Sequence, residues 1–344
     1  MADDRCALPL VDLSRFTAGA PEERAAVSEQ WDTTFSSLGF CLLTGHASTL
    51  PDALIEELRA QALAFFEAPQ EEKAKAASDG IYGYVGPGKE NVGATFGQPT
   101  SAPDLVESVS FPGYQEEGIH WAGAECPWAE APWLGGLPPG LLEAARAYWA
   151  AVTKLMRDLV RLTGAALDLP EGVLDAAFEQ PGALLRLAYY PAVEADDADA
   201  ADGPQRYGAH TDFDGLTILH RDAADGGVDG GGLEVQMWDT GEWFAPPAPP
   251  GTLTINIGDL LARWTNDRWR ATRHRVTRPR SGSASASRSR LSIVFFVGPH
   301  PDTVVECLPS AKCRGEAPRY APITAFEHVA AKMRAAVVDG SPSG

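Results

Sequence analysis

Apolar side chains recur every three or four positions in three segments of the first half of the chain. Pro21–Leu38 has this helical spacing, and Gly39 directly after it is typical of a helix end. The apolar run 39–43 then predicts a buried strand. A second helix is predicted from Pro51, and a long scaffold helix over 139–163, where apolar residues repeat at near-heptad spacing. The first half is therefore expected to be largely helical.

The second half has a different pattern, in which short β-type runs are separated by Gly, Pro, Asp and Ser. The clearest runs are Leu184–Tyr190, Leu216–Leu219, Leu233–Met237, Thr252–Ile257 and Leu291–Val297. Several such strands with turn signals between them predict a β-sandwich or a double-sheet barrel. We assign no role to two polar loops, 194–202 and 281–289. The segment from Gly80 to Trp133 shows no period and is expected to be irregular, as functional segments often are.

Charge and composition narrow the functions that the chain could have. The formal net charge of −19 disfavours nucleic acids and anionic membranes as partners, because both would be repelled. No stretch approaches the roughly 20 apolar residues that span a bilayer. The N-terminus has acidic residues where a signal peptide would be positively charged. We therefore expect a cytoplasmic protein.

Two residues with metal-binding side chains stand close together in the second half. His210 and Asp212 are two residues apart, and on a strand such residues face the same side. Two imidazoles and one carboxylate make the facial triad of non-haem iron(II) enzymes, which leaves three coordination positions open. His274 is the favoured second imidazole, although spacing alone does not separate it from other histidines. These are His46, His120, His220, His300 and His328.

Short motifs surround these residues in a definite order. They are Leu184–Pro191 (LLRLAYYP), His210–Asp212 (HTD), Gly232–Val235 (GLEV), Thr254–Asp259 (TINIGD), Trp264–Asn266 (WTN), Ala271–Val276 (ATRHRV) and Arg290–Ser292 (RLS). In this order and spacing the chain resembles the iron(II)/2-oxoglutarate-dependent dioxygenases of the isopenicillin-N-synthase-like type. The N-terminal part resembles them too, so the likeness runs from about Leu8 to Pro299. The N-terminal motifs are Leu8–Leu13, Gly39–Phe40, Phe65–Phe66 and Glu71–Lys73.

The resemblance implies a fold that is mainly β with flanking helices. The sheets would form a distorted double-stranded β-helix, or jelly roll, behind a helical N-terminal region. We accordingly expect residues 1–170 to be the mixed helical N-terminal region and 171–340 the jelly-roll oxygenase domain. In this family His210, Asp212 and His274 would be the Fe(II) ligands.

The co-substrate residues follow from the same resemblance. Arg290 and Ser292 are two apart on a predicted strand, so a guanidinium and a hydroxyl can bind the distal carboxylate of 2-oxoglutarate together. Tyr190 matches the tyrosine that hydrogen-bonds the co-substrate. Ala188 departs from the pattern, because many plant members have Asn there.

The implied reaction is oxidation of a small-molecule C–H bond with O2, usually hydroxylation, with release of succinate and CO2. Fe(II) and 2-oxoglutarate would be required, with ascorbate as a candidate reductant. Two other functions stay open: an Fe(II) oxidase of the same fold that needs no 2-oxoglutarate, and a jelly-roll binding protein without catalysis. Retention of all three metal-binding residues argues against the last of these.

The substrate pocket is the least defined part of the site. Phe296 lies on the same predicted strand as Arg290 and is a candidate for the wall of the substrate pocket. By its place in the family architecture, the irregular segment with Tyr82, Tyr84 and Lys89 is expected to cover the pocket mouth.

Overall fold

The structure of the chain is a computed structural model. It describes residues 7–78, 82–92, 103–113, 131–192, 205–222, 232–278, 288–313 and 317–336, with the backbone alone for 333–336. The polar loop 194–202 and nearly all of 281–289 lie outside these residues.

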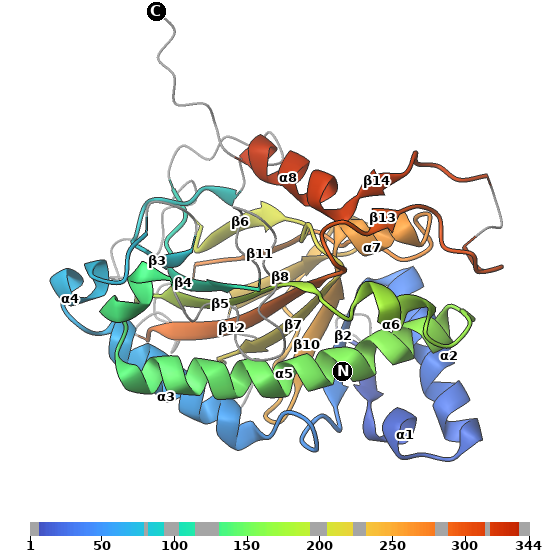
Figure 1. Cartoon of the computed structure of the whole chain (residues 1–344), viewed down its shortest axis with the longest axis horizontal. Helices are drawn as coiled ribbons and strands as arrows, with labels where there is room; N and C mark the ends of the chain where they lie inside the picture. The colour runs from blue at the N-terminus through green and yellow to red at the C-terminus, as the bar shows by residue number, and fades with distance from the viewer. Residues whose placement is uncertain are drawn as a thin grey trace, which may run out of the picture.

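Two sheets face each other and form the centre of the molecule (Figure 1). The larger has eight strands in the order β1-β2-β10-β7-β12-β5-β4-β3, and the smaller has four in the order β6-β11-β8-β9. The large sheet consists of β1 (Leu10–Asp12), β2 (Phe40–Thr44), β3 (Gly83–Val85), β4 (Glu107–Pro112), β5 (Gly182–Tyr190), β7 (Leu216–Arg221), β10 (Leu253–Ile257) and β12 (Arg290–Gly298). The small sheet consists of β6 (Tyr207–His210), β8 (Leu233–Gln236), β9 (Trp243–Phe244) and β11 (His274–Val276). Apart from the parallel pair β1–β2, the strand pairs of these two sheets are antiparallel.

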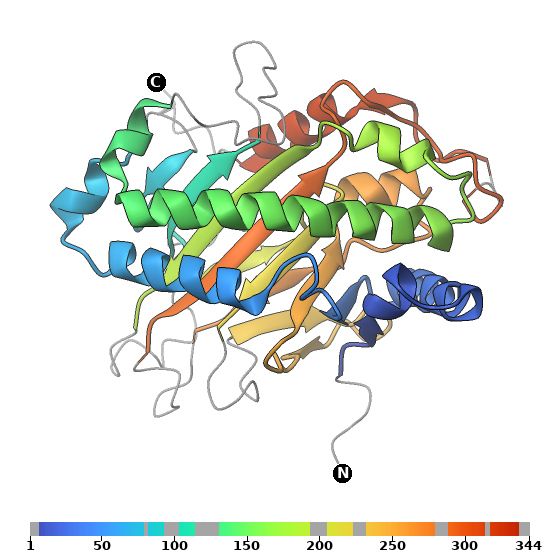
Figure 2. The same ribbon diagram turned by 60° about the horizontal axis from the view of Figure 1, so that its bottom comes forward.

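The helices flank the two sheets. They are α1 (Ser14–Thr17), α2 (Pro21–Ser37), α3 (Asp52–Phe66), α4 (Gln70–Ala74), the short 3-10 helix η3 (Pro132–Gly136), α5 (Pro139–Ala166), α6 (Val173–Ala177), α7 (Asp259–Trp264) and α8 (Ala325–Ala336). A two-stranded antiparallel sheet of β13 (Val304–Val305) and β14 (Ile323–Thr324) precedes α8. Figure 2 shows α3 and α5 side by side in front of the sheet. Trp149 of α5 packs edge-on against Phe295 of β12, with ring centroids 5.1 Å apart. None of the described helices is both long and apolar enough to cross a membrane.

Side chains on β5 and β12 alternate between the helices and the other sheet. The odd-numbered residues of both strands, from Leu185 to Tyr189 and from Leu291 to Val297, belong to the large core under the helices. The even-numbered ones point the other way, since residues two apart on a strand share a face. The face turned away from the helices therefore carries Arg186, Tyr190, Arg290, Ser292 and Phe296, and functional residues gather there.

The main predicted elements are confirmed. The helices at 21–38, from Pro51 and at 139–163 appear as α2, α3 and α5, and the five predicted runs appear as β5, β7, β8, β10 and β12. Gly39 ends α2 with φ +78°, and a Cβ there would collide with the Arg270 carbonyl, so glycine is required on both counts.

The expectation that 80–133 is irregular was wrong for part of the segment. It contains β3 and β4, and β4 pairs with β5 along its whole length. The pattern of β4, Glu-Ser-Val-Ser-Phe-Pro, looks half-exposed, yet every one of its residues is buried. Its polar face is covered within the protein, which sequence periodicity cannot reveal.

Strands from both halves of the chain share the large sheet. β2 pairs with β10, and β4 pairs with β5. The predicted boundary near residue 170 lies between α5 and α6 and stays a prediction.

Candidate metal centre

His210, Asp212 and His274 converge between the two sheets. All three are buried, and one ligand atom from each lies within 4.8 Å of the others. His210 ends β6 and His274 begins β11, and the two residues are direct partners in the ladder between these strands. Asp212 Oδ1 lies 3.6 Å from Nε2 of each histidine, too far for a hydrogen bond. This spacing suits three groups that share one cation.

The reason given above for the convergence of His210 and Asp212 is corrected by the structure. β6 ends at His210, so Asp212 lies in the turn that follows and not on the strand. That turn packs on the start of α7, where Asp259 N–H donates to the Asp212 carbonyl at 2.8 Å. Gly258 makes the approach possible, since a Cβ there would overlap the Asp214 carbonyl.

Hydrogen bonds fix the proton on each imidazole. Nδ1 of His210 donates to the Gly208 carbonyl at 2.8 Å, and Nδ1 of His274 donates to the Thr272 carbonyl at 3.1 Å. Because a carbonyl can only accept, the neutral form of each ring has its proton on Nδ1 and its lone pair on Nε2, where a metal can bind. Burial and the neighbouring His210 lower the pKa of His274 to about 4, so this ring is neutral at pH 7.

Hydrogen bonds and nearby imidazoles fix the orientation of the Asp212 carboxylate and keep it ionised. Oδ2 of Asp212 accepts hydrogen bonds from Thr217 Oγ1 at 2.5 Å and from Asn256 Nδ2 at 2.6 Å. Burial acts to raise the pKa of Asp212, but the imidazoles and the Thr217 hydroxyl outweigh it and hold the pKa below its usual range. Oδ1 is left facing the histidines. Thr217 and Asn256 were not predicted as site residues, although Asn256 stands inside the TINIGD motif.

The residues expected to bind 2-oxoglutarate lie together on the inner face of the large sheet. Arg290 pairs with Tyr190 in the β5–β12 register, its guanidinium carbon is 5.0 Å from the Tyr190 ring centroid, and Nη2 donates to Ser292 Oγ at 3.3 Å. Tyr190 packs in one cluster with Val276 of β11 and Tyr207 of β6. The cluster therefore adjoins the strands that carry the two histidines.

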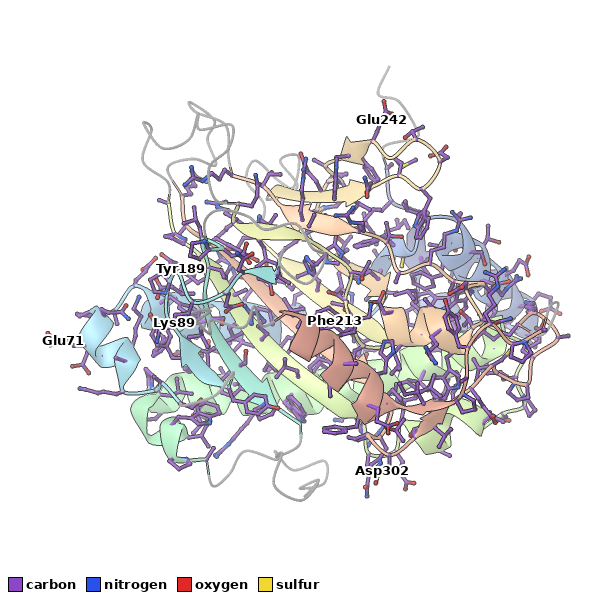
Figure 3. All side chains as sticks on the ribbon, turned by 90° about the horizontal axis from the view of Figure 1, so that it is seen from above. Glu71, Lys89, Tyr189, Phe213, Glu242 and Asp302 are labelled. Carbon is purple, nitrogen blue, oxygen red and sulfur yellow. The ribbon has the colours of Figure 1, made fainter. Side chains whose placement is uncertain are left out.

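A cavity of about 360 Å³ opens beside the candidate ligands. Its wall includes His210, Asp212 and three of the predicted pocket residues, Tyr82, Lys89 and Phe296. Further residues of the wall that were not predicted are Arg186, Asn91, Ser110, Tyr207, Phe213 and Val329. Figure 3 shows α8 lying across this side of the molecule with Phe213 beside it, and Lys89 on the side of β3 and β4.

The assignment of Tyr84 to the pocket is corrected. Tyr84 is not part of the cavity wall, because its ring packs edge-on against Phe65 in the core. Its hydroxyl donates to the buried Glu107 carboxylate at 2.6 Å. On a continuous strand the two tyrosines would share a face, but β3 begins at Gly83, so Tyr82 lies before the strand and its side chain does not follow that alternation.

Profiles of two protein families match the chain. The 2OG-Fe(II) oxygenase superfamily matches residues 181–299, and the family described as non-haem dioxygenase in morphine synthesis N-terminal matches residues 8–127. The chain is 33% identical to validamycin A dioxygenase of Streptomyces hygroscopicus subsp. limoneus, over 86% of this chain and 78% of that protein. It is 31% identical to a 2-oxoglutarate-Fe(II) type oxidoreductase of Emericella nidulans, over 93% and 88%.

Solved structures have the same fold. A full-length Neurospora crassa protein in complex with alpha-KG superposes with a TM-score of 0.78 at 24% identity, over 97% of this chain and 98% of that chain. A 2OG-Fe(II) oxygenase family protein from Caulobacter crescentus superposes with a TM-score of 0.77 at 26% identity, over 96% and 99%. These neighbours confirm the predicted jelly roll.

Fold, donor set and relatives agree on the chemistry. Two imidazoles and a carboxylate suit Fe(II), and the relatives include a 2-oxoglutarate-Fe(II) type oxidoreductase and a 2-oxoglutarate-dependent dioxygenase. The two alternative functions, an oxidase without 2-oxoglutarate and a binding protein without catalysis, lack such support. The chain belongs to the 2-oxoglutarate–Fe(II) oxygenase superfamily, and it is a 2-oxoglutarate-dependent dioxygenase that oxidises a small molecule.

Proposed function

We propose that the enzyme hydroxylates a C–H bond of its substrate at Fe(II) held by His210, Asp212 and His274. The observation that carries the proposal is the convergence of these three ligand atoms beside a cavity whose wall includes His210 and Asp212. When bound, Fe(II) and 2-oxoglutarate activate O2 for oxidation of the C–H bond, with release of succinate and CO2. The protein orients the ligands, because the Nδ1 and Oδ2 bonds leave Nε2 and Oδ1 for the metal.

The co-substrate residues follow from charge and position. In this proposal Arg290 and Ser292 bind the distal carboxylate of 2-oxoglutarate, and Tyr190 lines the same site. Both Arg290 and Ser292 are buried, and a buried guanidinium beside a hydroxyl is a strong partner for a carboxylate.

The predicted pocket residues Tyr82, Lys89 and Phe296 line the cavity and would contact the substrate. A small-molecule substrate agrees with the name of the relative validamycin A dioxygenase. The cytoplasmic location, and the absence of nucleic-acid and membrane partners expected from the net charge of −19, stay predictions.

Anaerobic titration of the Fe(II)-loaded protein with 2-oxoglutarate tests the proposal. Chelation of the keto acid by iron is expected to give a saturable metal-to-ligand charge-transfer band. His274→Ala should lose the band. His300→Ala is the control, because His300 is partly exposed and lies outside the cluster. A band of full strength in His274→Ala would refute the ligand set.

A further inference from the structure

The cavity beside the metal-binding residues is lined by both apolar and charged side chains. Phe213, Phe296 and Val329 contribute apolar surface, and Arg186 and Glu90 contribute charged groups to the same wall. Arg186 is on β5, whereas Glu90 lies in the segment after β3. The two residues are 96 positions apart and meet only in the folded chain.

Arg186 and Glu90 form a close ion pair. Nη2 of Arg186 donates to Glu90 Oε2 at 2.6 Å, and the two side chains are 15% and 18% exposed. Ser108 Oγ donates to the other oxygen, Oε1, at 3.0 Å. The guanidinium carbon lies 5.7 Å from the ring centroid of Tyr207. The pair is therefore fixed in orientation and still reaches the cavity.

The buried Asp104 holds the Glu90 segment against the metal-bearing strand. Asp104 N–H donates to the Glu90 carbonyl at 2.8 Å, and its carboxylate accepts the N–H groups of Val92 at 2.7 Å and of Gly208 at 3.0 Å. Gly208 is two residues before His210 on β6. The Arg186–Glu90 pair thus keeps a set position relative to the metal site.

Resting on the function proposed above, we propose that Arg186 and Glu90 recognise an uncharged amide group of the primary substrate. Guanidinium N–H groups donate to the amide oxygen, and the Glu90 carboxylate accepts the amide N–H. Both protein groups are planar and adjacent, as are the C=O and N–H of an amide. The apolar part of the substrate then lies toward Phe213, Phe296 and Val329.

The charge of the pair argues for a neutral group at this point of the wall, which elsewhere includes the cation Lys89. A substrate carboxylate that approached Arg186 would meet the Glu90 carboxylate, and an ammonium that approached Glu90 would meet the guanidinium. Either contact places like charges together in a partly desolvated site, which costs binding free energy. A ketone can accept a hydrogen bond from Arg186 but has no N–H group to donate to Glu90.

The test uses the full-length protein loaded with Zn(II) in place of Fe(II) and with 2-oxoglutarate. Three probes of similar size are compared by saturation-transfer NMR: 2-piperidone, an amide; cyclohexanone, an acceptor only; and cyclohexanecarboxylate, an anion. The wild type should bind 2-piperidone about tenfold more tightly than either other probe, since a hydrogen bond to a charged group has that order of effect.

The Glu90→Gln variant should reverse the preference. It removes the negative charge, so binding of 2-piperidone should fall about tenfold while binding of cyclohexanecarboxylate rises. Arg186→Lys keeps the charge but loses the planar donors, and should weaken binding of 2-piperidone as well. Glu234→Gln is the matched control. Glu234 pairs with Arg275, which lies over Trp243, and none of the three lines the cavity.

The outcomes separate this inference from the proposed function. Failure of 2-piperidone to bind, equal binding of cyclohexanone, or an unchanged probe preference in Glu90→Gln would overturn the amide assignment. The charge-transfer band of the Fe(II) form is measured on the same variants. A band with no amide preference refutes only this inference, whereas loss of the band in the wild type refutes the proposed function.

Discussion

At the scale of single residues, Asp212 shows how the site controls one oxygen atom. Thr217 and Asn256 both donate to Oδ2, and neither bonds to Oδ1. The two donors come from β7 and β10, neighbours in the large sheet whose register sets Asn256 opposite Thr217. The sheet thus orients a carboxylate that lies in a turn outside it.

Removal of one of these donors should weaken metal binding without removing a ligand. In Thr217→Val we expect the affinity for Fe(II) to fall about tenfold or more, because hydrogen bonds to metal ligands typically have effects of this size. Anaerobic titration with Fe(II) measures it. Thr153→Val is the control, since the buried Thr153 hydroxyl bonds only to the Trp149 carbonyl of its own helix among the described contacts. Equal affinity in the two variants would remove Thr217 from the site.

His274 should make the stability of the metal-free protein depend on pH. The pKa of His274 is about 4 in the folded protein and near 6.5 in the unfolded chain. The unfolded chain therefore binds this proton more tightly, and deprotonation of His274 stabilises the folded state. This contribution is complete above about pH 6.5 and is lost as the pH falls through about 4. Urea unfolding should show a loss on the order of 2 kcal/mol across this range that is absent in His274→Gln. Parallel pH curves for the two proteins would contradict the shift.

At the scale of elements, one carboxylate ties α2 to the segment that leads into the metal strand β11. Asp32 accepts hydrogen bonds from Arg268 Nε at 2.9 Å and from Trp269 Nε1 at 2.8 Å. Phe35, one turn further along α2, packs against the Trp269 ring with centroids 5.5 Å apart. These contacts of α2 therefore hold in place the segment that precedes His274.

Loss of the Asp32 carboxylate should be costly. Asp32→Ala leaves the side chains of Arg268 and Trp269 without this acceptor, so the free energy of unfolding should fall by about 3 kcal/mol. Guanidinium chloride denaturation measures the change. Glu72→Ala removes an exposed pair with Lys75 and should cost under about 1 kcal/mol. A cost for Asp32→Ala as small as that of Glu72→Ala would contradict the anchoring role.

At the scale of the whole molecule, the helix α8 contributes to the wall of the active cavity. Val329 of α8 lines the same wall as His210 and Asp212. Lys332 pairs with Asp259 of α7 at 2.7 Å, and Asp259 in turn accepts a hydrogen bond from Thr211 at 3.1 Å. In Figure 3 the helix lies beside the labelled Phe213, another residue of that wall. The C-terminal helix is thus coupled to the turn that carries Asp212.

A large side chain at Val329 should exclude substrate while sparing the co-substrate. In Val329→Trp we expect substrate-dependent consumption of 2-oxoglutarate to fall at least about tenfold, because the indole fills cavity volume. The charge-transfer band with 2-oxoglutarate should remain. Phe326→Trp on the same helix is the control, as Phe326 is 48% exposed. Loss of the band in Val329→Trp would show that the cavity does not separate the two ligands.

The sequence by itself determined the elements and the donor types. Helical periodicity located α2, α3 and α5, and apolar runs located β5, β7, β10 and β12, because burial of one face leaves a regular trace along the chain. The order of short motifs identified the candidate ligands and the arginine of β12. These features are local, or depend only on the order of local features.

Tertiary structure alone decided which groups meet. β6 and β11 are too short to show a period, and β4 hides its polar face inside the protein. The pairing of Glu90 with Arg186 and of Asn256 with Asp212 joins residues 96 and 44 positions apart. Such pairs are set by strand register and by packing between elements, and a shift of one residue would turn each side chain to the opposite face. For this reason, which chemical groups line the substrate cavity is decided by the tertiary structure and not by any local stretch of sequence.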